Sequence, residues 1–333
     1  AVSAPWVEGC NRMDLIIVPS EHSKQVFINT KYDRQDERTK QITGQLTVVK
    51  PIEVLFEGLD IDIFNKMQDK SKLPATIINS LDEIPEDFCF LTVGHWLKGD
   101  LGHDRKDIGG VIQTFLHSFK GKLSRNQPAL ILKTSEAGFS VIDREQILDK
   151  INAIKKLLDN VNLPNIYLLH GDLTPEEMNG LYNHPKVKSM ISFTHGEGFG
   201  RPLLEFSVTG KPVLAPKWSG HIDFLNKYSI QLSGELKQVH SSAVWENVII
   251  PESKWFYVNY GLASEWMKDV VKNYKIHLEV SRKQTKYVKD NFTLDHMYNA
   301  FKDILDNYIP DIPKQVELKL PKLKLPKLER ANE

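Results

Sequence analysis

The sequence has 333 residues, and its 43 basic and 43 acidic side chains give a formal charge of zero. This balance provides no bulk electrostatic attraction for nucleic acid, and no apolar run approaches the roughly 20 residues that span a bilayer. The length suits two ordinary domains, and a hydrophobic content of 41% is typical of a soluble globular protein. Cys10 and Cys89 have no metal-ligand spacing, so we expect reduced, buried thiols in a cytoplasmic protein.

Residues 1–64 contain one strand and helix that are easily recognised. The continuous apolar run at 15–18, LIIV, is typical of a buried strand. Ser20 follows it and is well placed to cap a helix over 21–30. An apolar segment at 52–56 is expected to end in a turn at Gly58.

Two polar spans interrupt this first part of the chain. The stretch 30–45 contains many charged side chains, and we expect it to be a surface excursion. The span 65–86 is polar and contains prolines, which suits a linker between two domains.

From Phe88 onward, apolar strands alternate with amphipathic helices. Strands are expected at 88–94, 129–134, 165–171, 188–198 (running into a loop) and 211–216, and helices at 106–119, 144–160, 174–184 and 202–210. Strands that are apolar throughout and alternate with helices predict a parallel sheet covered on both faces. In such folds, ligands bind beyond the carboxyl ends of the strands.

The last part of the chain is expected to be helical after about residue 255, with Thr293 as the cap of the final helix. The tail at 309–333 is rich in lysine and repeats KLPKL, and its closely spaced prolines forbid a continuous helix. We expect this tail to be disordered or loosely docked. Contact with an acidic membrane surface is the alternative, because clustered lysines are attracted to anionic lipid.

A glycine-rich loop, THGEGFG at 194–200, runs into a helix start marked by Pro202. The free backbone N–H groups around Phe199, Gly200 and Arg201 would point into the cleft with the positive end of the helix dipole. Such an arrangement receives a phosphate or diphosphate.

Two carboxylates, Glu197 and Glu205, stand on either side of this junction, the second on the first turn of the helix. Carboxylates repel phosphate but accept strong hydrogen bonds from hydroxyl groups. A ligand with phosphate in the middle and hydroxyls at both ends is a nucleotide-sugar. The pair therefore predicts a nucleotide-sugar site.

The segment from Glu197 to Glu205 matches the E-x7-E motif of retaining GT-B glycosyltransferases, and the chain resembles the glycosyltransferase 4 family. The motif region resembles that family over 192–225, with weaker similarity over 88–301. The resemblance implies an α/β fold of GT-B type, with a Rossmann-like parallel sheet in a C-terminal donor domain at 87–308.

The resemblance also implies roles for single residues. Glu197 would contact hydroxyls of the donor sugar, and Glu205 would bind the nucleotide ribose. Gly198, Phe199 and Gly200 would supply backbone N–H groups to the sugar and phosphates.

The family holds the diphosphate with a basic pair, usually Gly-Arg shortly before Lys-Gly. Here His95 stands where the arginine is expected, and Lys106 fits the lysine after an insertion. This departure leaves the second cation open between Arg105, Arg201 and Lys133.

The resemblance places the loop at 170–173, with Gly171, close to the nucleotide base through its backbone. His22, His170 and His195 can also be read as general bases, although lone histidines in loops are more often structural or on the surface.

Residues 1–64 resemble only the end of the family's first domain. The acceptor-side glycine loop, and the histidine or aspartate that usually faces the reacting carbon, would then lie upstream of Ala1. We expect a donor half-site together with a remnant of the acceptor half.

The predicted function is transfer of a hexose from a nucleoside diphosphate sugar to a hydroxyl acceptor, with retention of anomeric configuration. Glu197 and Lys106 would be the catalytic residues, with the departing diphosphate stabilised by Lys106, a neighbouring cation and the helix start. No DxD-type cluster ends a strand, so we predict no metal cofactor.

Other functions remain open. The main alternative is a non-catalytic GT-B module that binds nucleotide-sugar or assembles with partners. A glycogen synthase-like enzyme is a rival, whereas a phosphorylase would need a pyridoxal-lysine motif that is not found. A Rossmann dehydrogenase is disfavoured because no GxGxxG follows the strand at 88–94.

Overall fold

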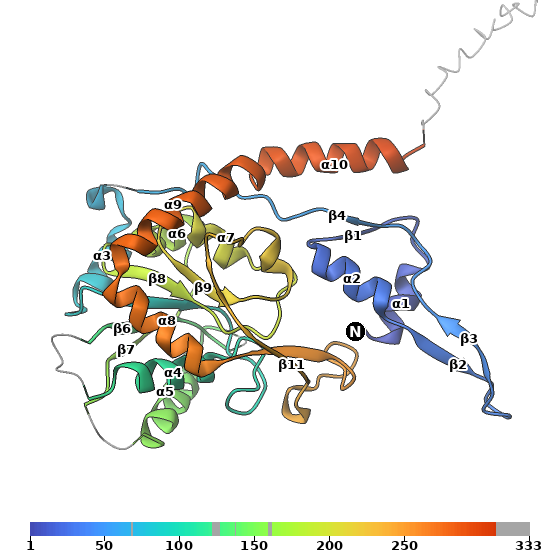
Figure 1. Cartoon of the computed structure of the whole chain (residues 1–333), viewed down its shortest axis with the longest axis horizontal. Helices are drawn as coiled ribbons and strands as arrows, with labels where there is room; N and C mark the ends of the chain where they lie inside the picture. Colours follow the sequence, from blue (N-terminus) through green and yellow to red (C-terminus); the bar gives the residue numbers. More distant parts are fainter. Residues whose placement is uncertain (68, 122–126, 137, 159–161, 311–333) are drawn as a thin grey trace, which may run out of the picture.

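The structure is a computed structural model that describes residues 1–310, apart from 68, 122–126, 137 and 159–161. Most of the lysine-rich tail at 309–333, and its predicted membrane contact, therefore lie outside the described residues. A six-stranded parallel sheet forms the centre of the larger domain (Figure 1). Its strands are β5 (Cys89–Val93), β6 (Ala129–Lys133), β7 (Ile166–Leu169), β8 (Val187–Ile191), β9 (Val213–Pro216) and β10 (Ile230–Leu232).

Helices cover both faces of this sheet, which confirms the predicted fold class. Successive strand residues point to opposite faces, so Phe90 joins one apolar cluster and Leu91 the other. One face is packed against α4 (Ile108–Phe119), α5 (Val141–Lys156) and α8 (Tyr260–Lys272). The other face is packed against α3 (Ala75–Asp82), α6 (Pro175–Asn183), α7 (Arg201–Ser207) and α9 (Tyr274–Asn291).

The order of the strands is β10-β9-β8-β5-β6-β7, so β5 lies in the middle and pairs with both β8 and β6. The chain proceeds outward from β5 in one direction and from β8 in the other. Doubly wound sheets bind ligands at this switch point, beyond the carboxyl ends of the two central strands.

The first 54 residues form a separate N-terminal body. It contains α1 (Ala4–Cys10), β1 (Ile16–Val18), α2 (Glu21–Asn29), β2 (Tyr32–Gln35), β3 (Ile42–Leu46) and β4 (Ile52–Val54). β1 pairs in parallel with β4. The Ser20 hydroxyl accepts a 3.1 Å hydrogen bond from the Ser23 N–H, which confirms the predicted helix cap.

The polar stretch 30–45 lies on the surface as expected, and it forms the antiparallel hairpin β2–β3. Its turn is built by Asp36, whose Oδ1 accepts hydrogen bonds from the N–H groups of Arg38 (3.0 Å) and Thr39 (2.7 Å). Nearly all of its side chains are exposed, so the hairpin has no apolar alternation by which the sequence would reveal it.

The span 65–86, predicted to be a linker between domains, contains regular structure. It contains a short 3-10 helix, η1 (Lys70–Lys72), and then α3. Ile77 and Leu81 of α3 are buried in the core of the larger domain because they lie on the same face of the helix. The domain limits themselves remain a prediction.

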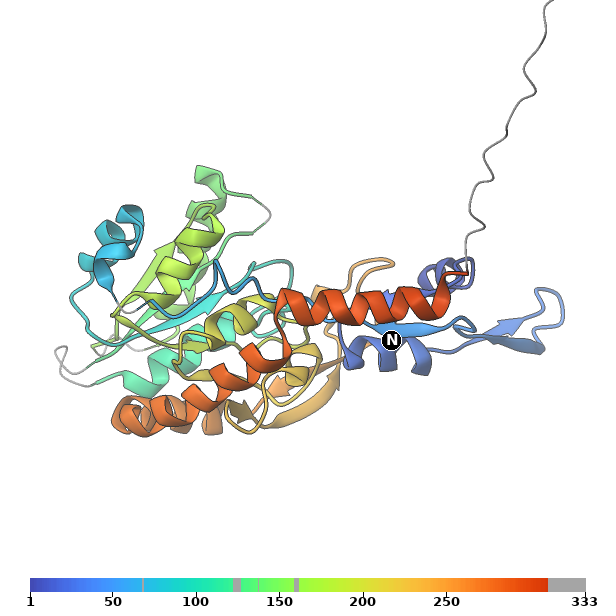
Figure 2. The same ribbon diagram turned by 90° about the horizontal axis from the view of Figure 1, so that it is seen from above.

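The last helix, α10 (Leu294–Tyr308), returns from the larger domain to the N-terminal body, as Figures 1 and 2 show. The Thr293 hydroxyl accepts a 3.4 Å hydrogen bond from the His296 N–H, as the predicted cap requires. The carbonyl oxygen of Leu59 accepts a 3.0 Å hydrogen bond from the Leu294 N–H, and the Tyr308 hydroxyl donates to Glu53 at 2.6 Å. The chain therefore passes twice between the two bodies.

An antiparallel pair, β11 (Gly234–Gln238) and β12 (Lys254–Val258), was not predicted. The segment between them, 239–253, includes the short helix η4 (Ser241–Ala243), and a further 3-10 turn, η3 (Gly220–Asp223), follows β9. Cys89 is buried as expected, whereas Cys10 is only half-buried, and both thiols are free.

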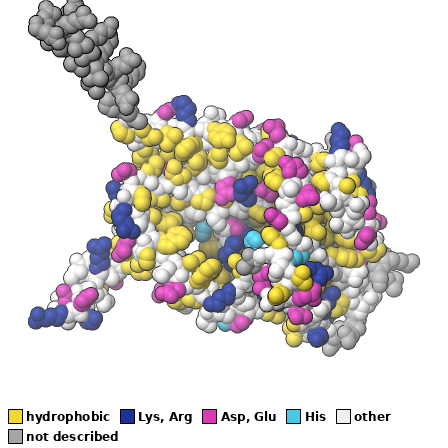
Figure 3. All heavy atoms as spheres, turned by 180° about the vertical axis from the view of Figure 1, so that it is seen from behind, with side chains coloured by type: hydrophobic (Ala, Val, Ile, Leu, Met, Phe, Trp, Pro, Cys, Tyr) yellow, Lys and Arg dark blue, Asp and Glu magenta, His cyan; other side chains and the backbone are white. Residues whose placement is uncertain are grey.

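Hydrophobic side chains also gather on the surface, close to the C-terminal end of α10 (Figure 3). Tyr298, Phe301 and Tyr308 of this helix are all substantially exposed. Within the described part of the chain, no helix has the length and apolar character needed to cross a bilayer.

Candidate active site

The loops after β5 and β8 meet at the switch point of the sheet. The carbonyl oxygen of Arg105 accepts a hydrogen bond from the N–H of His195 at 2.8 Å and another from the Thr194 hydroxyl at 3.3 Å. Asp107 caps α4 by accepting from the Gly110 N–H at 3.0 Å. These bonds fix residues 105–107 against the loop that contains the glycine-rich segment.

Glu197 is held there by two cations. Its Oε1 pairs with Lys106 Nζ, and its Oε2 accepts from Arg105 Nη1 at 3.2 Å. The Glu197 and Lys106 side chains are only 9% and 12% exposed. Burial alone would raise the pKa of Glu197, but Lys106 and Arg105 outweigh it and hold the pKa at about 2. Glu197 is therefore ionised, and its charge is matched inside the protein.

This arrangement decides which cation lies beside Lys106. Arg105 shares Glu197 with it, whereas Arg201 lies 3.6 Å from Glu205 and is 60% exposed. Lys133 donates instead to the carbonyl oxygen of Gly171 at 2.6 Å. Of the three candidates, Arg105 is the one that shares a carboxylate with Lys106.

Two glycines make this close approach possible. A Cβ on Gly94 would lie 3.1 Å from Lys106 Cε. The lysine side chain therefore passes so close to Gly94 that a larger residue there would crowd it. Gly200 has φ +102°, and a Cβ there would lie 3.1 Å from His221 Cβ and 3.6 Å from Glu197 Cγ. Both residues therefore leave room around the ion cluster.

The glycine-rich loop leaves backbone donors free in the described structure. The N–H groups of Gly198, Phe199 and Gly200 donate to no acceptor among the described residues. Gly198 is exposed, and its carbonyl oxygen accepts from the Ser20 hydroxyl of the N-terminal body at 2.5 Å. The loop thus touches the opposite body, and these three backbone donors have no acceptor in the described part of the chain.

Glu205 lies on the second turn of α7, not on the first as its spacing suggested, because the helix begins at Arg201. Its Oε2 accepts a 3.0 Å hydrogen bond from the Tyr182 hydroxyl, and its side chain is 11% exposed. Burial raises the pKa of Glu205, while Tyr182 and Arg201 oppose that effect. The carboxylate is buried beside Tyr182 and Arg201, with a small part accessible.

A second, smaller group lies at the ends of β5 and β6. His95 and Lys133 line a pocket of about 80 Å³ together with Gly94 and Ser135. His95 Nδ1 is 3.0 Å from Ser135 Oγ. A Cβ on Gly94 would lie 3.1 Å from Lys106 Cε, so this pocket adjoins the ion cluster. Glu205 and Arg201, also predicted for the donor, lie apart from both groups, on α7.

The three histidines read as possible bases differ in their surroundings. Both ring nitrogens of His195 face backbone carbonyl oxygens, of Phe256 at 2.8 Å and Gly102 at 3.1 Å. His170 Nε2 lies 2.6 Å from an oxygen of Asp143. These two rings have structural roles. His22 lines a pocket instead, and burial lowers its pKa to about 4.

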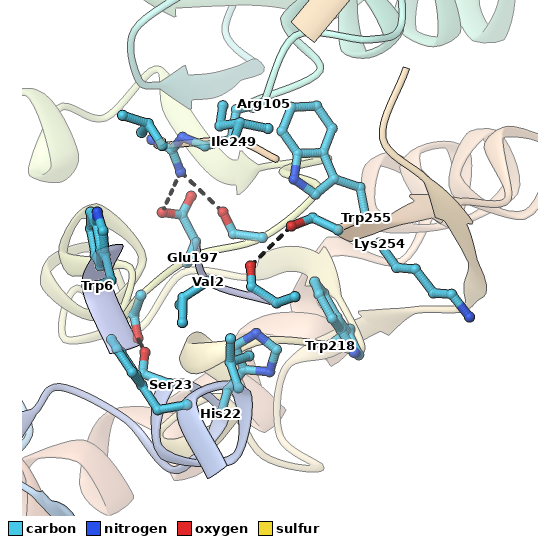
Figure 4. A pocket seen from close by; sticks show the side chains of 17 residues that line it. Val2, Trp6, His22, Ser23, Arg105, Glu197, Trp218, Ile249, Lys254 and Trp255 are labelled. Carbon is cyan, nitrogen blue, oxygen red and sulfur yellow. Dashed lines mark hydrogen bonds and ion pairs between the residues drawn. The ribbon is translucent and has the colours of Figure 1, made fainter. Parts of the chain in front are cut away.

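That pocket, of about 320 Å³, lies between the N-terminal body and the larger domain (Figure 4). Glu197 and Arg105 line it, as do three tryptophans that were not predicted from the sequence: Trp6, Trp218 and Trp255. They come from α1, from the loop after β9 and from β12, so no short motif connects them. The position of Trp218 after a strand end is the single signal that could have pointed to it.

Among the described residues, no three His, Cys, Asp or Glu side chains are grouped so that they could hold a metal ion. The expectation that no metal is needed remains a prediction.

No family model matches the sequence, and no curated protein matches it significantly. Solved structures do match the fold. Sucrose-phosphate synthase from Thermosynechococcus elongatus aligns with a TM-score of 0.60 at 13% identity, covering 91% of this chain and 60% of that protein. A glycosyltransferase from Rickettsia africae gives 0.57 at 15% identity, covering 94% and 69%.

The Anabaena protein HepE, solved in complex with UDP-glucose, aligns with a TM-score of 0.58 at 14% identity, covering 92% of this chain and 68% of HepE. The chain thus has the GT-B fold of these glycosyltransferases. It spans 60 to 69% of their lengths.

Proposed function

We propose that this chain binds a nucleoside diphosphate sugar and transfers its hexose to a hydroxyl acceptor with retention of configuration. The observation that carries the proposal is the cluster of Glu197, Lys106 and Arg105 at the switch point of a GT-B fold. The UDP-glucose bound by HepE, a protein of the same fold, supports the class of donor.

The cluster suggests how a donor would bind. A diphosphate is a stronger partner for Lys106 and Arg105 than one carboxylate, because it has more charge and more acceptor oxygens. As the cations turn to the diphosphate, Glu197 becomes free to accept hydrogen bonds from sugar hydroxyls. After the exchange the two cations pair with the diphosphate and Glu197 accepts hydrogen bonds from hydroxyl groups, so no buried charge is left without a polar partner.

The same groups would promote the reaction. Negative charge grows on the diphosphate as the bond to the anomeric carbon breaks. Lys106 and Arg105 would stabilise that charge together with the free N–H groups of Phe199 and Gly200. Glu205, on α7, would accept hydrogen bonds from the ribose. His95, Lys133 and Gly171 would lie toward the nucleotide base.

The test is a panel of UDP-, GDP- and ADP-sugars mixed with the full chain, with binding followed by thermal shift and transfer by release of free nucleoside diphosphate. We expect one nucleotide class to raise the melting temperature, and the same result in excess EDTA, because no metal is proposed. NMR of the product would give its anomeric configuration. Binding without any transfer or hydrolysis would favour a non-catalytic nucleotide-sugar module.

A further inference from the structure

The pocket of about 320 Å³ has a wall of aromatic side chains, Trp6, His22, Trp218 and Trp255, which we call the aromatic pocket. Figure 4 shows Glu197 among these rings, with Arg105 beside it. The pocket therefore contains the charged end of the proposed donor site and a hydrophobic end that the donor site does not explain.

Trp6 is not part of any core. It is 49% exposed, and Val7 is the buried residue of the short helix α1. Trp6 makes no contact with another aromatic ring among the described residues. A large apolar side chain that lines a pocket in this way is free to cover a flat apolar surface of a ligand.

The opposite wall is held in place by its neighbours. The Trp218 ring is stacked with Phe256, at 6.0 Å between centroids and 11° between planes, and His22 meets it edge-on at 4.5 Å. Trp255 stacks on His195 at 5.2 Å. Aromatic surfaces fixed before a ligand arrives lose little entropy when they bind it.

A second set of contacts closes this side of the pocket. The segment 239–253 contributes Val248 and Ile249 to the lining. Its His240 stacks on His103 of the loop before Lys106, with centroids 4.0 Å apart. The segment also reaches the N-terminal body, where the Ser3 hydroxyl donates to Asn247 O at 3.0 Å.

This combination matches the chemistry of a sugar ring. A pyranose presents a face of C–H groups, which are attracted to the electron-rich face of an indole, and a rim of hydroxyls. The hydroxyl of Ser23 offers an acceptor for that rim, and Glu197, proposed to contact the donor sugar, lies at the charged end of the same pocket. A lipid tail is less suitable, because it would remove water from the charged groups at the end of the pocket and could form no hydrogen bonds to them in exchange.

We infer that the acceptor is a carbohydrate whose ring packs against Trp6, across from Trp218 and Trp255. The role of this carbohydrate as the acceptor rests on the proposed function, whereas its position follows from the fold. Trp6 and His22 belong to the N-terminal body, whereas Glu197 belongs to the donor side, so a ring in the pocket lies between the two.

The transfer step balances with this placement. A hydroxyl oxygen of the ring forms a bond to the anomeric carbon of the donor. The bond from that carbon to the diphosphate breaks, and its electron pair leaves with the diphosphate. The hydroxyl proton passes to the departing diphosphate.

Methyl glucoside, methyl galactoside and methyl mannoside are each titrated into the full chain in the presence of saturating UDP, GDP or ADP. Ligand-observed NMR and calorimetry measure the binding of each glycoside. Trp6→Ala is compared with Trp266→Ala, which removes a tryptophan of similar exposure (40%) from α8, outside the pocket. Thermal melts verify that both variants are folded, and Trp6→Phe tests whether an aromatic ring suffices.

We expect at least one glycoside to bind, Trp6→Ala to weaken it about tenfold, and Trp266→Ala and Trp6→Phe to weaken it less than about threefold. Nucleotide affinity should be equal in all four proteins. Nucleotide binding without binding of any glycoside would overturn the carbohydrate acceptor and leave the proposed function standing. Equal losses in Trp6→Ala and Trp266→Ala would also overturn it, and absence of nucleotide binding would overturn both proposals.

Discussion

Arg105 Nη1 donates to Oε2 of Glu197 at 3.2 Å, so a cation expected at the diphosphate and a carboxylate expected at the sugar contact one another. Lys106 completes the cluster at Oε1. The three side chains come from loops after two strands that are neighbours in the sheet but about 90 residues apart in the sequence. The cluster therefore depends on the fold, and its behaviour can be tested residue by residue.

The first prediction distinguishes the contribution of the nucleotide to binding from that of its sugar. In Glu197→Gln, the neutral amide keeps the shape of the side chain but releases Lys106 and Arg105 from a charged partner. We expect UDP, GDP or ADP alone to bind as tightly as before or more tightly. The matching nucleotide-sugar should lose the contribution of its hydroxyls, about tenfold or more in affinity. Calorimetry with each ligand pair measures the difference.

A parallel loss for nucleotide and nucleotide-sugar would contradict this division of roles. Glu145→Gln, at an exposed surface position, is the matched control.

The second prediction concerns acid. The pKa of Glu197 is held at about 2 in the folded chain, below its ordinary value of 4.5. Since the folded pKa is the lower one, the ion cluster stabilises the fold fully above pH 4.5, and this contribution is lost as the pH falls toward 2. Burial raises the pKa of Asp104 to about 6, which gives a dependence of opposite sign.

Melting temperatures of wild type and Glu197→Gln are measured at a series of pH values. Because both proteins contain Asp104, its effect drops out of the difference between their melting temperatures. The difference between the two proteins should be constant above about pH 5 and shrink toward pH 2. A difference that does not change over this range would mean that Glu197 has an ordinary pKa.

The third prediction concerns the ribose. If Glu205 accepts hydrogen bonds from ribose hydroxyls, Glu205→Ala should weaken nucleotide binding about tenfold. The variant should then bind the ribonucleotide and its 2′,3′-dideoxy analogue equally, whereas wild type prefers the ribonucleotide. If the variant still preferred the ribonucleotide over the dideoxy analogue, another residue would have to bind the ribose hydroxyls. Tyr182→Phe, which removes the 3.0 Å hydrogen bond to Glu205, tests whether that bond positions the carboxylate.

Much of the fold could be predicted from the sequence because the strands of the large sheet are buried on both faces. Such strands are continuous apolar runs, as at 88–94 and 129–134, and they stand out from amphipathic helices. The hairpin at 30–45 was missed for the opposite reason, since its side chains face solvent and show no alternation. Helix α3 was missed because few of its eight residues are buried.

The site was only partly predictable. The motif around Glu197 identified the glycine-rich loop, and Lys106 was located by its place before a helix. The pairing of Arg105 with Glu197 was not predictable, because it needs the packing of two loops. The aromatic pocket was harder still, since Trp6 and Trp255 are separated by most of the chain and meet only when the N-terminal body faces the larger domain.

The fourth prediction tests the backbone of the glycine-rich loop. Gly200 has φ +102°, where a side chain is strained, and a Cβ would press on His221. Gly200→Ala should therefore lower the free energy of unfolding by about 1–3 kcal/mol. The control is Gly9→Ala in helix α1, where a Cβ meets nothing within 4 Å. It should leave stability unchanged or raise it by up to about 1 kcal/mol.

Urea titration of the three proteins gives the comparison. Equal stability of Gly200→Ala and wild type would show that the loop adopts another conformation in solution.

In the proposed donor site, Lys106 and Arg105 bind the diphosphate beside Glu197. The most direct measurement is calorimetric titration of UDP, GDP and ADP into wild type, Lys106→Ala and the control Lys286→Ala, whose lysine side chain is 77% exposed. We predict that one nucleotide binds wild type and the control equally, and that Lys106→Ala weakens it by about 10- to 100-fold. Unchanged affinity in folded Lys106→Ala would contradict the assignment of the donor site.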